Sequence, residues 1–203
     1  MAKHPPEDTP DRLTVSRRTF LKTVGASAAA TGLVGAVPRP AQAEILGPEA
    51  IPLALKLNGV THTVIVEPRV TLLRALRNHL GLTGAKEVCE RGACGGCTVL
   101  FDGEPICACL MLAADAVGHE ITTVEGLGTP EKLSPVQAAF VECDAFQCGF
   151  CTPGFIVAST ALLNKHPNPS LEEIKAGLSG NLCRCGTYSR IFEAVQKAAK
   201  QRG

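Results

Sequence analysis

The sequence predicts an α+β protein in which a small sheet with one crossing helix precedes a region of four helices. Between residues 50 and 125, short apolar runs alternate with turn signals, which is typical of strands. After residue 132, helix-start signals recur and the apolar residues follow helical spacing. Eight of the ten cysteines form two tight sets, one in each of these regions. Each region is therefore expected to carry one group of four thiols.

The first region begins with a hairpin. Residues 53–57 and 61–66 are strand-like and are joined through Asn58-Gly59, a strong signal for a tight turn. In residues 71–80, apolar leucines recur at helical spacing and predict a helix with one face on the sheet. Residues 98–101 and 120–124 are two further strands, the first ending at an Asp-Gly turn. This outline is that of a ferredoxin-like β-grasp.

The second region follows a linker at residues 126–131, which contains glycine and proline and shows no periodicity. Ser134-Pro135 and Thr152-Pro153 each supply an N-cap followed by proline, and they open predicted helices at 135–143 and 153–165. A capping box from Ser170 to Glu173 starts a third helix, and residues 189–200 make the fourth.

The first cysteine set has the spacing Cys-x4-Cys-x2-Cys, with eleven residues before the fourth member. Its members are Cys89, Cys94, Cys97 and Cys109. This is the spacing of plant-type [2Fe-2S] ferredoxins. Glycines in the loop allow backbone N–H groups to approach the sulfur atoms. Structural zinc is the alternative, although its usual pattern is two short pairs of cysteines well apart.

The second set consists of two short pairs, Cys148 with Cys151 and Cys183 with Cys185. Taken alone, two such pairs are also compatible with zinc, and a lone Cys-x-x-Cys with a redox dithiol, although the second pair argues against the dithiol. Both pairs lie at predicted helix starts, where the positive end of the helix dipole stabilises thiolates.

Three segments in order resemble the iron-sulfur subunit of the xanthine oxidase family of molybdenum hydroxylases: CERGACGGCTVL (89–100), QCGFCTPG (147–154) and NLCRCGTY (181–188). The resemblance implies a ferredoxin-like domain at 50–125 with a solvent-side cluster. It also implies a four-helix-bundle domain at 132–201 whose cluster faces the molybdenum cofactor. The ligands it implies for two [2Fe-2S] clusters are Cys89, Cys94, Cys97 and Cys109, then Cys148, Cys151, Cys183 and Cys185. It further implies that Gln147 and Cys185 contact the pterin of the molybdenum cofactor.

The implied function is electron relay from a large molybdenum-cofactor subunit, with a FAD subunit or a cytochrome as acceptor and no catalytic residue on this chain. An exported aldehyde oxidoreductase is the closest match. A heteroaromatic hydroxylase of the isoquinoline or xanthine type, a free-standing electron carrier and a zinc-stapled interaction module remain alternatives.

Cys107 and Cys143 are left over. Cys107 competes with Cys109 as a ligand because it precedes that residue by only two positions, and the family pattern favours Cys109. For both extra cysteines we favour the interpretation of small buried apolar side chains over a disulfide between them.

The N-terminus predicts export. Ser16-Arg17-Arg18 begins a twin-arginine signal, and an Ala-x-Ala cleavage site ends at Ala43, so residues 1–43 are expected to be removed in the periplasm. An uncleaved anchor is the alternative, but the apolar run at 23–37 is shorter than the ~20 residues that span a membrane. The twin-arginine translocase carries folded proteins, so clusters can be inserted before export.

The charge balance argues against nucleic-acid binding. Six of the 20 basic residues lie in the leader with three of the 19 acidic ones, which leaves 14 basic and 16 acidic residues in the mature chain. Trp is absent and aromatic residues are few, so we expect bound clusters to contribute much of the folding free energy.

Overall fold

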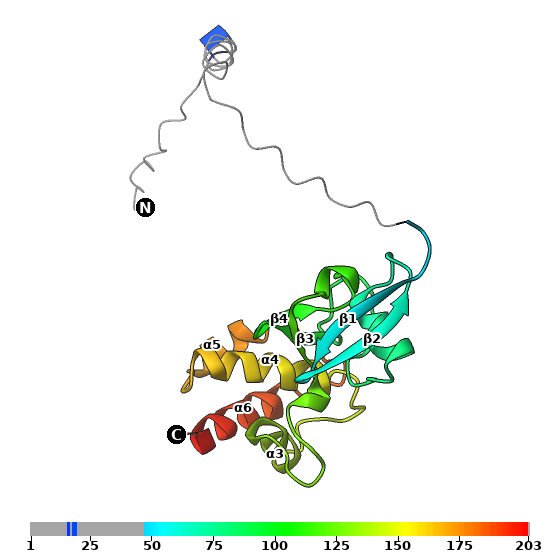
Figure 1. The fold of residues 1–203 in the computed structure, drawn as a ribbon. Helices are drawn as coiled ribbons and strands as arrows, with labels where there is room; N and C mark the ends of the chain where they lie inside the picture. Colours follow the sequence, from blue (N-terminus) through cyan, green and yellow to red (C-terminus); the bar gives the residue numbers. More distant parts are fainter. Residues whose placement is uncertain (1–15, 17, 20–46, 203) are drawn as a thin grey trace. The chain divides into compact units, whose positions relative to one another are not determined.

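The computed structural model describes residues 16, 18, 19 and 47–202, and residues 46–203 form one compact unit. Its sheet has five strands in the order β2-β1-β5-β3-β4. Figure 1 shows β1 and β2 side by side. Strands β1 (Ile51–Leu57) and β2 (Val60–Val66) form the predicted antiparallel hairpin. Asn58 and Gly59 have φ values of 52° and 82°, the positive values that a two-residue hairpin turn requires.

Strand β5 (Glu120–Thr122) joins the two hairpins. It runs parallel to β1 and antiparallel to β3 (Thr98–Phe101). The predicted strand 120–124 is two residues too long, because Val124–Gly126 form the 3-10 turn η4. Alternate residues of β1 face inward, and Leu55 and Leu57 are almost fully buried.

Strand β4 (Glu104–Cys107) was not predicted. It pairs antiparallel with β3 across a turn in which Asp102 and Gly103 have positive φ. Its sequence, Glu-Pro-Ile-Cys, contains a proline and lacks clear alternation. Pro105 is tolerated because β4 is an edge strand, where one backbone N–H group needs no partner strand.

The helix predicted at 71–80 is present but changes type along its length. Leu72–Arg74 form the short α-helix α2, and Ala75–His79 form the π-helical turn η2. The Leu80 amide donates to the Ala75 carbonyl, five residues back, at 3.2 Å. The apolar face is as expected, since Leu72, Leu73 and Leu76 are buried in the core beneath the sheet.

The second half contains four helices: α3 (Pro135–Glu142), α4 (Thr152–Lys165), α5 (Leu171–Gly177) and α6 (Tyr188–Arg202). Capping boxes at Ser134 and Ser170 start α3 and α5. The capping prediction for α4 was wrong, because Thr152 is the first helical residue and Cys151 occupies the N-cap.

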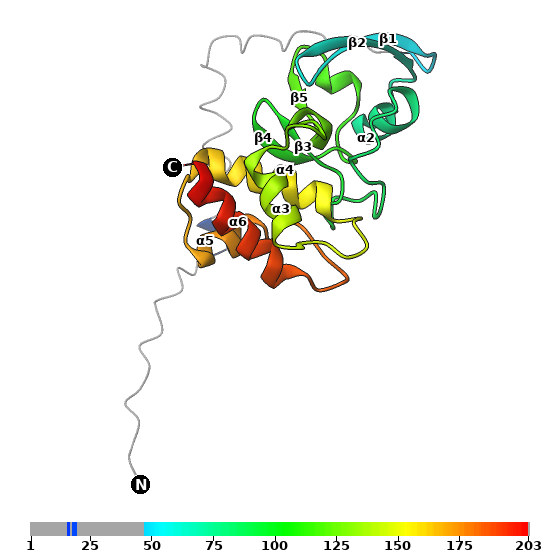
Figure 2. The ribbon, with the colours of Figure 1, turned by 90° about the horizontal axis from the view of Figure 1, so that it is seen from below.

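Helix α4 lies between the sheet and the other helices (Figure 2). Nine of its 14 residues are buried, which explains why it is apolar on nearly all sides. Val157 and Ala161 of α4 pack against Leu100 of β3, so this helix joins the cores of the two halves.

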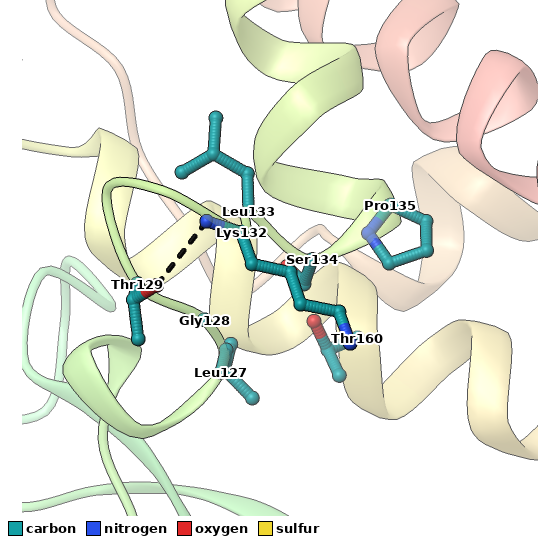
Figure 3. A pocket seen from close by; sticks show the side chains of 8 residues that line it. All are labelled: Leu127, Gly128, Thr129, Lys132, Leu133, Ser134, Pro135 and Thr160. Carbon is teal, nitrogen blue, oxygen red and sulfur yellow. Dashed lines mark hydrogen bonds between the residues drawn. The ribbon is translucent and has the colours of Figure 1, made fainter.

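The linker between the two halves closes on itself through backbone hydrogen bonds between Thr129 and Lys132. It borders a hollow lined by Leu127, Gly128, Thr129, Lys132, Leu133, Ser134, Pro135 and Thr160 (Figure 3). None of these lining residues is a cysteine, so the hollow is separate from the candidate metal centres.

Within the described part of the chain, no helix has both the length and the apolar character that crossing a membrane requires. The predicted cleavage site after Ala43 and the apolar run at 23–37 lie outside the described residues, as does Arg17 of the twin-arginine pair.

Candidate metal centres

The β3–β4 hairpin holds two members of the first cysteine set together. Cys97 immediately precedes β3 and Cys109 closely follows β4, and both side chains are buried. The Ala108 amide donates to the Cys97 carbonyl at 3.3 Å, which extends the hairpin as far as these two residues. Cys89 and Cys94, in the preceding loop, are partly exposed.

The four thiols of this set lie close together. The Cys89 side chain is hydrogen-bonded to that of Cys94, and the Cys97 side chain contacts both Cys109 and the leftover Cys107. Backbone N–H groups of glycines also point at sulfur, because Gly92 N lies 3.3 Å from Cys109 Sγ and Gly96 N lies 3.5 Å from Cys94 Sγ. Gly92 has a φ of +69°, a left-handed conformation that suits glycine.

The second set is built at the starts of two helices. Cys148 and Cys151 lie just before and at the N-cap of α4, and Cys183 and Cys185 lie in the loop that leads into α6. Their thiols meet in two pairs, Cys151 with Cys183 and Cys148 with Cys185. The prediction that both halves of the set lie at helix starts is therefore confirmed.

Tyr188 and Thr187 support this second site. The Cys183 amide donates to the Tyr188 hydroxyl at 2.8 Å, and Cys183 Sγ lies 3.2 Å from Thr187 Oγ1. Tyr188 also makes an edge contact with the buried Phe155 ring. The sequence indicated only a packing role for Tyr188, because a bond to the amide of a residue five positions earlier leaves no pattern in the sequence.

The local environments give the thiols of each set different pKa values. A hydrogen bond from the Arg91 backbone lowers the pKa of Cys89 to about 7. Burial raises the pKa of both Cys97 and Cys151 to about 12. At Cys183, burial alone would raise the pKa of the thiol. Hydrogen bonds from the side chain and backbone of Thr187 outweigh this effect, and the pKa is lowered to about 7. Each set therefore combines an easily ionised thiol with one that ionises reluctantly until a metal binds it.

Four thiolates are the protein ligands of a [2Fe-2S] cluster, and each cysteine set supplies four thiols. Moreover, the Thr152 hydroxyl beside Cys151 is buried without a protein hydrogen-bond partner, and a cluster sulfur would accept from it. The residues present fit the cluster.

The predicted pterin-contact residues lie at the surface of the second site. Gln147 and Cys148 are exposed, and Cys185 is partly exposed. This exposure leaves the Gln147 and Cys185 side chains free to meet a partner, and their contact with a pterin stays a prediction.

The two leftover cysteines are not joined. All ten cysteines are free thiols, and Cys107 packs with the core beneath the sheet whereas Cys143 belongs to the helical core. Cys143 is buried, in keeping with its interpretation as an apolar side chain. Cys107 is only half-buried, and its thiol lies 3.8 Å from the Gly92 carbonyl, beside the first set.

Replacing Cys109 by Ser tests the assignment of the fourth ligand. We expect it to remove the first cluster's electron paramagnetic resonance (EPR) signal and lower the iron content from roughly four to two per chain, because one of four thiolates is lost. The matched variant Cys107→Ser should keep both signals and full iron. The opposite result would exchange the roles of these two residues.

Two family models match the chain. One, described as a 2Fe-2S iron-sulfur cluster binding domain, covers residues 55–120, and the other, a [2Fe-2S] binding domain, covers residues 123–196. Each of the two cysteine sets falls inside one of these ranges.

Curated relatives and solved structures agree with the models. The chain is 43% identical to the aldehyde oxidoreductase iron-sulfur-binding subunit PaoA of Escherichia coli O157:H7, over 98% of this chain and 93% of that protein. It is 46% identical to the nicotinate dehydrogenase small FeS subunit of Eubacterium barkeri, over 74% of this chain and 96% of that protein. A crystal structure of quinoline 2-oxidoreductase from Pseudomonas putida 86 matches with a TM-score of 0.73 and 43% identity, over 76% of this chain and 98% of that chain.

Proposed function

The chain belongs to the iron-sulfur small subunits of the xanthine oxidase family of molybdenum hydroxylases, and from this we propose that it relays electrons through two [2Fe-2S] clusters in an aldehyde oxidoreductase. It is thus a subunit of an oxidoreductase whose substrate chemistry belongs to a large molybdenum-cofactor subunit. The observation that carries the proposal is the presence of two separate sets of four free thiols within one compact unit.

Bound [2Fe-2S] clusters supply one-electron redox chemistry, and the chain supplies binding, spacing and electrostatics. Cys89, Cys94, Cys97 and Cys109 would hold the first cluster, and Cys148, Cys151, Cys183 and Cys185 the second. The N–H groups of Gly92 and Gly96 stabilise negative charge on sulfur at the first site. The start of α4 does the same at the second site through its helix dipole.

The surface of the second site suits a docking partner. Phe150 and Leu182 are 58% and 50% exposed, and together with Val88 and Arg184 they line a hollow. This hollow contains Cys148 and Cys151 and also Cys94 of the first set. Apolar side chains exposed around thiol ligands are costly in water unless a partner covers them. We assign this surface to the large subunit, whose molybdenum cofactor would then meet Gln147 and Cys185.

The similarity to PaoA supports the aldehyde as substrate class, because it extends over 98% of this chain. A heteroaromatic hydroxylase is the second candidate, since the nicotinate dehydrogenase subunit is 46% identical and the quinoline oxidoreductase chain has the same fold. Small subunits from both classes are alike because substrate contacts belong to the large subunit.

The predicted signal at 1–43 supports the aldehyde class and a periplasmic location. The match to the nicotinate dehydrogenase subunit covers nearly all of that protein but leaves about a quarter of this chain unmatched, which is close to the size of the predicted signal at 1–43. The match to PaoA covers 98% of this chain, so it leaves no unmatched segment of that size. We therefore propose export by the twin-arginine translocase, with domains at 50–125 and 132–201 already folded around their clusters. A FAD subunit or a cytochrome is the proposed acceptor.

The relay is tested by adding an aldehyde to the purified complex without oxygen. With excess aldehyde we expect both [2Fe-2S] EPR signals to appear, because electrons from the substrate stay on the clusters once the flavin or cytochrome is reduced. Signals that appear with dithionite but not with an aldehyde or a quinoline would contradict the relay. Signals that appear with the quinoline alone would favour the heteroaromatic class.

The docking surface is tested by Phe150→Gln. Loss of an aromatic anchor at an interface should weaken binding of the large subunit by about tenfold, a cost of about 1.4 kcal/mol. Ile65→Gln is the matched control, because Ile65 is 65% exposed on β2, at the opposite edge of the sheet from β4. Equal retention of the large subunit by both variants, with full iron, would place the interface elsewhere.

Export is tested by replacing Arg17 and Arg18 together by Lys. We expect the assembled complex to remain in the cytoplasm with its clusters intact, because the translocase reads the arginine pair. The measurement is the distribution of this chain and of aldehyde oxidation between cell fractions. Unchanged periplasmic activity would remove the twin-arginine proposal.

A further inference from the structure

The loops that carry the two cysteine sets touch each other directly. The Leu182 amide, next to Cys183, donates to the Cys94 carbonyl at 2.9 Å. One position along each loop, the Asn181 side chain meets the backbone of Gly95. Gly154, at the start of α4, faces the Gly95 carbonyl so closely that an added side chain would collide with it. We call Gly95, Gly154 and Asn181 the loop clamp.

Asn181 is the polar centre of the clamp. Its side chain is 7% exposed, and its Nδ2 donates to the Gly95 carbonyl at 2.9 Å and to Thr98 Oγ1 at 3.3 Å. The Thr98 hydroxyl donates in turn to the Gly95 carbonyl at 2.7 Å. The backbone N–H of Asn181 donates to the Leu178 carbonyl, which fixes Asn181 against the end of α5. Asn181 is thus held on one side by the second half of the chain and on the other by the first.

Two glycines bring the backbones together. A Cβ on Gly154 would lie 2.2 Å from the Gly95 carbonyl oxygen, and a Cβ on Gly95 would lie 2.5 Å from Asn181 Nδ2. Gly95 also has a φ of +68°. Because these neighbours include fixed backbone, neither position can gain a side chain unless the loops move apart.

We propose that Asn181 is a positioning residue that fixes the separation of the two cluster-binding loops. This inference rests on the proposed function, because it concerns two bound clusters. Gly95 lies between two thiols of the first set, Asn181 lies two residues before Cys183, and Gly154 lies three residues after Cys151. A shift at the clamp therefore moves one thiol set relative to the other.

The test is the magnetic interaction between the two clusters in the purified complex reduced with dithionite. Each reduced [2Fe-2S] cluster is paramagnetic. The electron spin of one cluster splits the EPR signal of the other, and the size of this splitting reports the distance between the two clusters. We expect Asn181→Leu, which keeps the volume and removes both donors, to retain full iron and both signals with reduced splitting. Gly154→Ala, which wedges the loops apart sterically, should reduce the splitting in the same way.

Thr160→Val is the matched control, because Thr160 is as buried as Thr98 but its hydroxyl bonds only within α4, to the Ile156 carbonyl. Its splitting should equal that of the unaltered complex. Full iron with unaltered splitting in both clamp variants would overturn the inference. Loss of iron in both would assign the clamp to folding and overturn its positioning role. An unaltered complex without two [2Fe-2S] signals would instead contradict the proposed function.

Discussion

The packing of helix α4 on strand β3 is the constraint on which both candidate sites depend. Cys151 occupies the N-cap position of α4 and Cys97 precedes β3, so one contact between two elements sets the positions of thiols in both halves. The apolar part of this contact is small, since Leu100 meets only Val157 and Ala161 among fully buried side chains. Polar contacts complete it, and the hydrogen bonds of Asn181 and Leu182 reach directly into the first cysteine loop. The sites and the interface between the halves are therefore built from the same residues.

This arrangement links metal binding to stability. The chain has no tryptophan, and its two hydrophobic cores consist mainly of small and medium-sized aliphatic side chains. Cys97 and the partly buried Cys151, whose pKa values are raised mainly by desolvation, must become thiolates to bind iron. The free energy of metal binding offsets that cost and adds to folding, as in other small metal-binding domains. Thiols left without metal would place reactive sulfur at a surface that also exposes Phe150 and Leu182.

The sequence predicted those parts of the molecule whose causes are local. The Asn58-Gly59 turn, the capping boxes at Ser134 and Ser170 and the burial of Leu72, Leu73 and Leu76 follow from rules about neighbouring residues, and the structure contains all of them. Strand β4 escaped prediction because its pairing with β3, and not its own sequence, makes it a strand. The π-helical turn after Arg74 escaped for a similar reason, because a shift of one hydrogen bond leaves the apolar spacing intact. At the sites, the spacing of the cysteines predicted the thiol sets, but the contacts of Asn181 and Tyr188 join residues by tertiary packing and have no local signal.

The central claim is that two sets of four thiols hold two [2Fe-2S] clusters that serve a molybdenum enzyme. The most direct measurement is the content of iron, zinc and molybdenum per copy of this chain in the native complex, together with EPR of the reduced sample. This account predicts roughly four irons, two distinct [2Fe-2S] signals and co-purifying molybdenum. Zinc in place of iron, with neither signal, would mean that the cysteines are structural and would contradict the account.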